Sequence, residues 1–180
     1  MAITINGTGS ITGISAGGLP DGVITTDDIA ASAVTSAKLA AGAAGKILQV
    51  VNATYATLVS SSTNTYVDTG LTASITPSSA SNKILVTVFQ VGLTASYTAY
   101  GGLRLVRNTT EILGLESEFA YIFTSGQWNN IGASGCSYLD SPNTTSSVTY
   151  KTQFRSSGNF ASVEVQRFGN STITLMEVAA

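Results

Sequence analysis

The chain has 180 residues, enough for one ordinary domain and a short extension. Hydrophobic residues make up 43% of it and charged residues only 10%, where soluble proteins average roughly 25% charged residues. The net charge is −2 and the basic residues are scattered, so we expect no nucleic-acid partner and no anionic membrane surface. The mean hydropathy of +0.27 suggests that some apolar surface is buried between subunits.

The residue types needed for chemistry are scarce. The chain contains no histidine, which is the commonest general base and the commonest metal ligand. Its single cysteine, Cys136, cannot form an intrachain disulfide, and we expect a buried thiol without a catalytic role. We therefore predict that the protein is not an enzyme and carries no metal or cofactor. No segment has the length of a membrane span, so no membrane insertion is expected.

Residues 1–22 are rich in glycine and contain few large apolar side chains, among them Ile3, Ile5, Ile11 and Ile14. Such a segment cannot bury enough surface to fold alone. It is either a disordered tail or an extended strand held by sister chains or by a neighbouring protein. We expect the second, with these four isoleucines as the docking residues.

Residues 23–45 contain an internal repeat of ten residues, in which 23–32 align with 33–42. Ten is not a multiple of the helical period, so two short helices fit better than one long helix. Thr25 and Thr35 are suitable N-caps. Each cap is flanked by apolar residues at the spacing of a hydrophobic staple, which are Ile24, Ile29, Val34 and Leu39.

Helices of this length are unstable alone, because roughly 12–15 residues are needed even for marginal helicity in water. We therefore expect Ile24, Ile29, Val34 and Leu39 to pack along an axis shared with other subunits. The alternative is that the two helices lie on the flank of the chain's own β-domain.

From residue 46 to residue 180 the sequence is typical of strands separated by turns. The pattern predicts strands at 47–58, 65–75, 83–93, 102–106, 111–115, 148–154, 161–168 and 171–178. About eight strands without an intervening helix predict a mainly-β fold, an antiparallel β-sandwich resembling a jelly roll.

The segment 161–168 shows a regular alternation. It predicts one inward-facing set, Ala161, Val163, Val165 and Phe168, and one solvent-facing set, Ser162, Glu164 and Gln166.

Aromatic side chains in predicted loops are the candidate binding residues, namely Tyr97, Tyr100, Tyr121 and Trp128. Aromatic rings beside polar groups suit the surfaces of sugars or proteins. The alternative is that these rings close the end of the sandwich or lie in a subunit interface.

Several motifs carry a resemblance to a known group of proteins: GGLPDG at 17–22, VITT at 23–26, GKILQVV at 45–51, YVDTGL at 66–71, ITPSSA at 75–80 and ITLMEV at 173–178. They resemble fibre and other virion proteins of tailed bacteriophages, notably environmental and cyanobacterial ones. The resemblance spans nearly the whole chain and brings no catalytic motif. It implies a trimer whose N-terminal region is seated on the virus particle and whose β-domain points outward.

On this resemblance we expect a homotrimeric tail fibre or spike that is made in the bacterial cytoplasm and assembled into the virion. Residues 1–22 would dock to another virion protein of the tail, baseplate or capsid. Residues 23–45 would form the trimer axis, and residues 46–180 would present loops to a host-surface glycan or protein. The first alternative is a capsid decoration protein, either a cement or a head fibre. A glycan depolymerase is the third possibility.

Overall fold

The computed structural model describes residues 27, 29–31, 33–35, 38, 45–96, 99–119, 128–157 and 161–180, with the backbone alone at 128–131. The chain divides into two compact units, Met1–Ala44 and Gly45–Ala180. We describe each unit by itself.

In the first unit, the described residues form two tight turns. The amide of Ala33 donates to the carbonyl of Ala30 at 2.9 Å, and the amide of Lys38 donates to the carbonyl of Thr35 at 2.9 Å. The second turn begins at Thr35, the residue that the sequence predicts as an N-cap. The two short helices stay a prediction, because most of the repeat lies outside the described residues.

The second unit is built from strands, and the described part of the chain contains no α-helix. This confirms the prediction of a mainly-β protein. The strands are β1 Ile47–Tyr55, β2 Val59–Ser61, β3 Val67–Ile75, β4 Lys83–Ser96, β5 Gly101–Arg107, β6 Thr110–Phe119, β7 Trp128–Asp140, β8 Val148–Ser156, β9 Val163–Val165 and β10 Ser171–Val178.

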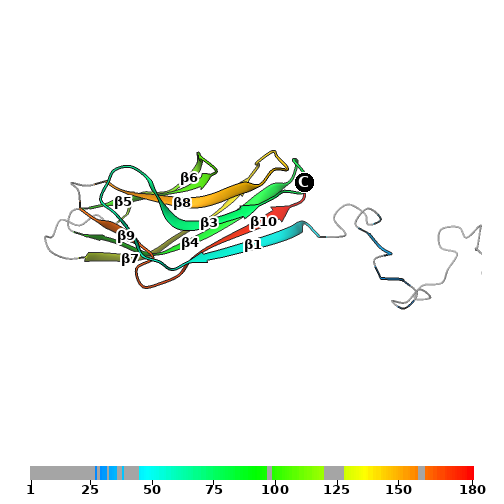
Figure 1. Ribbon diagram of the computed structural model, residues 1–180, viewed down its shortest axis with the longest axis horizontal. Helices are drawn as coiled ribbons and strands as arrows, with labels where there is room; N and C mark the ends of the chain where they lie inside the picture. The colour runs from blue at the N-terminus through cyan, green and yellow to red at the C-terminus, as the bar shows by residue number, and fades with distance from the viewer. Residues whose placement is uncertain are drawn as a thin grey trace, which may run out of the picture. The chain divides into compact units, whose positions relative to one another are not determined.

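These strands form two antiparallel sheets, which lie as two layers in Figure 1. Sheet A has the order β1-β10-β4-β9-β2, with β7 paired to β4, and sheet B has the order β3-β8-β5-β6. The short strands β2 and β9 pair with each other, while β9 and β10 both pair with β4. Sheet A therefore has four rows of strands, two of which are interrupted: β1 with β2, β10 with β9, then β4, then β7.

The core lies between the sheets and consists of two apolar clusters. The first takes buried residues from both sheets, which are Leu71, Ala73, Ile75, Ile84, Val86, Val88, Leu105, Val148, Tyr150, Ile173 and Leu175. The second cluster lies further along the strands and contains Leu93, Ala95, Ala99, Leu103, Phe119, Phe154, Val163 and Val165. Alternate residues of each strand thus face the other sheet, as expected for two half-buried antiparallel sheets.

A belt of buried polar side chains separates the two clusters along the strands. Gln90 donates to Ser171 Oγ at 2.8 Å and accepts from Thr152 Oγ1 at 2.9 Å, and Thr152 is 2.6 Å from Thr69 Oγ1. Each of these four side chains is almost completely buried. Because each hydrogen-bonds within the belt, the desolvation cost of burying them is offset.

Most predicted strands are found at nearly the predicted positions, and β10 has the predicted bounds. The clearest miss is β7, because the sequence predicted no strand between residues 115 and 148. Strand β7 pairs with β4 along almost its whole length. Its glycines and serines give little strand propensity, so tertiary pairing decides its conformation.

The alternation predicted for 161–168 is partly wrong. Val163 and Val165 are buried as predicted, but Gln166 is also buried and Phe168 is 84% exposed. The regular strand ends at Val165, and both Gln166 (φ 59°) and Phe168 (φ 70°) have left-handed backbone conformations. Glu164 is also buried, because β9 lies between β2 and β4 and Glu164 accepts from Thr94 Oγ1.

Candidate functional site

The two ends of the second unit carry different segments of the chain. Strand β4 runs the length of sheet A, about 45 Å for its 14 residues. Its first residue, Lys83, pairs with Val178 near the start of β1, and Ala179 donates to the carbonyl of Lys46. The second unit therefore begins at this end, where the C-terminus also lies (Figure 1).

The opposite end is where four connections gather: β2 to β3, β4 to β5, β6 to β7, and β8 to β9. Ser96, the last residue of β4, pairs with Trp128 at the start of β7, and Gly101 of β5 pairs with Phe119 of β6 and with Ser156 of β8. We call this the loop end. The strand ends thus bring together the segments that the sequence predicted as a binding region.

Of the predicted contact residues, Tyr97 and Tyr121 lie outside the described residues. Trp128 is placed by its backbone, which pairs with Ser96. Tyr100 is half-buried, and its carbonyl accepts a hydrogen bond from the amide of Ser157 at 2.7 Å. The receptor contact therefore stays a prediction, although Tyr100 and the backbone of Trp128 do lie at the same end.

The predicted axis and docking residues are described only in part. Ile29 is 43% exposed and Val34 is 51% exposed, which are high values for large apolar side chains. Ile24 and Leu39, the other two axis residues, lie outside the described residues. The same holds for the docking residues Ile3, Ile5, Ile11 and Ile14.

Sheet B has a charged outer face on which the charges are paired. Arg104 donates to Glu111 Oε2 at 2.9 Å and to Gln153 Oε1 at 2.7 Å. Lys151 and Gln153 both donate to Asp68, at 2.9 and 2.7 Å. Burial acts to raise the pKa of Asp68, but the hydrogen bonds from Lys151 and Gln153 outweigh it, so the net shift is downward.

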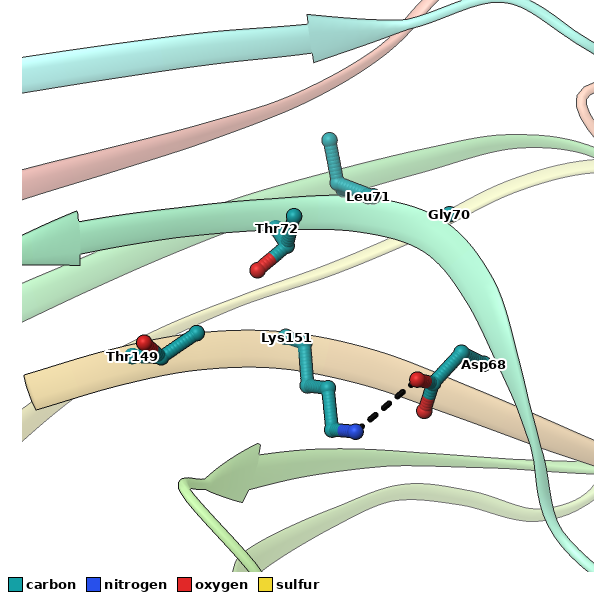
Figure 2. A pocket seen from close by; sticks show the side chains of 6 residues that line it. All are labelled: Asp68, Gly70, Leu71, Thr72, Thr149 and Lys151. Atoms are coloured by element: carbon teal, nitrogen blue, oxygen red, sulfur yellow. Dashed lines mark hydrogen bonds and ion pairs between the residues drawn. The ribbon is translucent and has the colours of Figure 1, made fainter.

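An open recess of about 240 Å³ lies beside this ion pair (Figure 2). It is lined by Asp68, Gly70, Leu71, Thr72, Thr149 and Lys151. Its polar groups are already bonded to one another or to neighbours: Thr72 donates to the carbonyl of Tyr150, and Thr149 hydrogen-bonds with Ser74. The recess thus offers one neutralised ion pair and two satisfied hydroxyls, which is a poor basis for binding a ligand or for acid–base chemistry.

The buried ionisable groups are held in structural networks. Asp140 accepts from Arg107 at 2.9 Å and from the hydroxyl of Tyr150 at 2.6 Å. Burial and the Asp140 carboxylate raise the pKa of Tyr150 well above its ordinary value. Burial also raises the pKa of the Cys136 thiol, which packs against the first apolar cluster. A thiol with a raised pKa stays protonated at neutral pH and is a weak nucleophile.

Among the described residues, no group of three or more acidic or cysteine side chains could hold a metal ion. The same residues include no helix that is long and apolar enough to cross a membrane.

The outer face of sheet A is a surface that the sequence analysis did not identify. Three rows of side chains cross it from β1 to β7, and neighbours within each row are register partners. The first row is Val50, Met176, Leu85 and Leu139; the second is Asn52, Thr174, Thr87 and Ser137; the third is Thr54, Thr172, Phe89 and Gly135. The signal was present in the alternation of β4, where Leu85 and Phe89 are the apolar residues out of phase with the core.

No protein-family model and no curated protein matches the chain. Among solved structures, it is similar to a chain in the structure of infectious bursal disease virus, Gx strain, with a TM-score of 0.36 and 16% sequence identity. The match covers 73% of this chain and 37% of that chain, so the similarity spans little more than a third of the viral chain.

Proposed function

We propose that the protein is a homotrimeric attachment protein of a virus particle, a tailed-bacteriophage fibre or spike. Its N-terminal segment would anchor it to the virion, and its β-domain would face the host surface. The observation that carries this proposal is the difference between the two ends of the second unit: the unit begins at one end, directly after residues 1–44, and four connections gather at the other. A tethered binding protein needs this separation, because the anchor must not obstruct the contact surface.

We further infer that the second unit is a jelly roll. Its eight rows of strands have the order β1-β10-β4-β7 and β3-β8-β5-β6, with β2 and β9 continuing β1 and β10. Two four-stranded sheets of this kind recur in viral capsid domains and in lectins. Both groups use loops on a rigid sandwich to contact other molecules, which supports an adhesive role.

The exposed side chains of Ile29 and Val34 support association through the repeat. Apolar residues that come together into one exposed patch commonly lie in contacts between proteins, and the proposal places Ile29 and Val34 in such a patch. In this proposal three copies of 23–45 pack around one axis. Each head would then bind weakly to a host-surface glycan or protein, and the three contacts would reinforce one another through their high effective concentration.

The proposed role requires no catalysis. The buried acids Asp140, Glu164 and Glu177 accept hydrogen bonds from neighbouring side chains, which supports a structural role for each. For Glu177, these hydrogen bonds lower the pKa of the carboxyl group, which makes it a poor general base.

A capsid decoration protein is the second candidate, and the strand order favours it too, since jelly rolls recur in viral shells. The two candidates differ in where the N-terminal segment docks. Imaging the intact virus particle at a resolution that traces the chain separates them. We expect residues 1–22 against the tail and the loop end pointing away from the particle. Docking on the capsid lattice would favour decoration, and a loop end facing the particle would contradict both.

A further inference from the structure

Three rows on the outer face of sheet A, between β1 and β7, carry no acidic or basic residue. Charged groups flank the rows: Lys83 lies at one end, and the ion pair of Glu164 and Arg167 lies on the β9 side. The large exposed hydrophobic residues of the described second unit all belong to sheet A strands or to the connections between them: Ile47, Leu48, Val50, Leu58, Phe89, Leu139 and Phe168. Val50 is 57% exposed and Phe89 is 54% exposed.

Sheet B provides the contrast within the same domain. Its outer face carries Arg104, Glu111, Asp68 and Lys151, which form ion pairs suited to contact with water. The outer face of sheet B is therefore suited to contact with water, whereas the three uncharged rows of sheet A are less so. An uncharged face with exposed large apolar side chains, here Val50, Phe89 and Leu139, is suited to contact with another protein.

We propose that this face packs against further copies of the same chain, with three domains around an axis parallel to the strands. The proposal rests on the homotrimer of the proposed function and assigns the contact surface of its β-domains. The trimer contact would thus continue from the repeat into the sandwich, because β1 follows directly after residues 23–45.

Contact between identical copies agrees with the arrangement of the rows. The rows run across the strands, so an axis parallel to the strands places each row at the same height in all copies. The apolar row of Val50, Met176, Leu85 and Leu139 then contacts the same apolar row of the other two copies. The row of hydroxyl and amide side chains likewise contacts the same row of the other copies. Because the rows carry no charge, bringing identical faces together creates no like-charge repulsion.

The width of the face agrees with three copies. Four strands spaced about 4.8 Å apart give a face about 19 Å wide. Three faces of that width form a triangle whose centre lies about 5.5 Å from each side. Side chains reach about 5 Å from a sheet, half of the roughly 10 Å between packed sheets. Three such faces can therefore close around an axis that their own side chains fill.

The area shows that the face acts together with the repeat. From Lys83 to Val91 the face is about 27 Å long, so each copy contributes roughly 500 Å². Each copy shares this area between two neighbours, so each pairwise contact buries roughly 500 Å² in total, less than a specific interface that stands alone. The repeat at 23–45 would supply the rest of the contact in the proposed trimer.

In this arrangement β1 of one copy lies beside β7 of the next, so Asn52 and Ser137 of neighbouring copies approach each other. Within one chain they occupy opposite edges of the sheet, about 14 Å apart, which is too far for a disulfide. A full-length variant with Asn52→Cys, Ser137→Cys and Cys136→Ala tests the contact by mild oxidation and non-reducing gel electrophoresis. The matched control also carries Cys136→Ala and pairs Asn52→Cys with Ser74→Cys, an exposed position on the outer face of sheet B.

We expect covalent species up to three times the chain mass of 18.4 kDa from the test pair and none beyond the monomer from the control pair. Separately, Val50→Glu with Leu139→Glu should raise the concentration at which the trimer half-dissociates at least tenfold, whereas Ser74→Glu should leave it unchanged. Circular dichroism of each variant checks that the domain is folded.

The outcomes separate this inference from the proposed function. A wild-type trimer whose test pair stays uncrosslinked overturns the inference and leaves the proposed function standing. Covalent species that stop at dimers overturn the threefold arrangement. Crosslinked trimers that are absent from virus particles support the inference and overturn the proposed function. A monomeric wild-type protein overturns both.

Discussion

Glu177 is a buried carboxylate that ties three segments together near the end of β10. It accepts hydrogen bonds from the amide and hydroxyl of Ser78, from Asn82 and from Gln49, at distances of 2.6 to 2.8 Å. Burial acts to raise the pKa of Glu177, but these hydrogen bonds outweigh it and lower the pKa from 4.5 to about 2. The ionised form is thus the one that stabilises the fold.

The pH dependence of folding follows from this shift. The folded pKa is lower than the unfolded pKa, so Glu177 stabilises the protein above pH 4.5, by about 3 kcal/mol. That contribution is lost as the pH falls toward 2. We predict that Glu177→Gln lowers the free energy of unfolding at pH 7, and that its difference from wild type shrinks by about 2 kcal/mol at pH 3. Urea unfolding of both proteins at the two pH values measures it, and a difference independent of pH would refute it.

Tyr150 illustrates a buried hydroxyl with one essential partner. It is completely buried, and its hydroxyl donates to Asp140, which Arg107 also contacts. We predict that Tyr150→Phe lowers the free energy of unfolding by about 1 to 2 kcal/mol, because Asp140 loses one donor but keeps the other. Asp140→Ala should cost more, since it leaves both Tyr150 and Arg107 without that partner. Thermal unfolding of the two variants measures which substitution destabilises the protein more. A larger loss for Tyr150→Phe than for Asp140→Ala would contradict the prediction.

At the scale of elements, the turn after β9 depends on close approach to β4. Gly92 has a φ of 62°, and a Cβ atom there would lie 2.2 Å from the backbone nitrogen of Arg167. The amide of Arg167 also donates to the carbonyl of Gly92. A side chain at Gly92 would therefore push the turn away from the strand as well as strain its own backbone.

Gly132 is a matched control for this position. Its φ of 92° is also left-handed, but nothing lies within 4 Å of a Cβ atom placed there. We predict that Gly132→Ala costs about 1 to 2 kcal/mol of unfolding free energy, from backbone strain alone. Gly92→Ala should cost about 3 kcal/mol or more, because the steric clash is added. Equal losses in chemical denaturation would show that the contact with Arg167 is unimportant.

The strands that the sequence predicted correctly are those whose own residues determine them. In β10, alternating Ile173 and Leu175 face the core, and β-branched neighbours favour extended backbone. Strand β7 could not be predicted, because Gly132, Gly135 and Ser137 are poor strand formers and their conformation depends on pairing with β4. The polar belt could not be predicted either. A glutamine such as Gln90 is expected to face solvent, and its buried partners on the opposite sheet are not evident from the sequence.

One of the candidate surfaces could likewise be predicted from the sequence, and the other could not. Loops bearing Tyr97, Tyr100 and Tyr121 were identified from their composition, and the strand ends that flank them are indeed brought to one end. The outer face of sheet A was not identified, because its rows combine residues from four strands whose register the sequence does not reveal. Its only indication in the sequence is that Leu85 and Phe89 are apolar, although they lie at the positions of β4 that face away from the core.

At the scale of the whole molecule, the proposed trimer would be held by apolar and hydroxyl surfaces. The outer rows of sheet A contain no charged residue, and the proposed axis residues of the repeat are apolar. We therefore predict that the trimer persists when the salt concentration is raised from about 50 mM to about 1 M, conditions that screen exposed ion pairs. Light scattering after size-exclusion chromatography measures the mass, and dissociation at high salt would mean that charged groups hold the copies together.

The central claim is that this chain exists as three copies packed around one axis. Sedimentation equilibrium of the full-length protein tests it most directly, because the mass it gives does not depend on molecular shape. The account predicts a mass of three times 18.4 kDa at micromolar concentration. A single species of 18.4 kDa, with Ile29, Val34 and the outer face of sheet A left exposed to water, would contradict it.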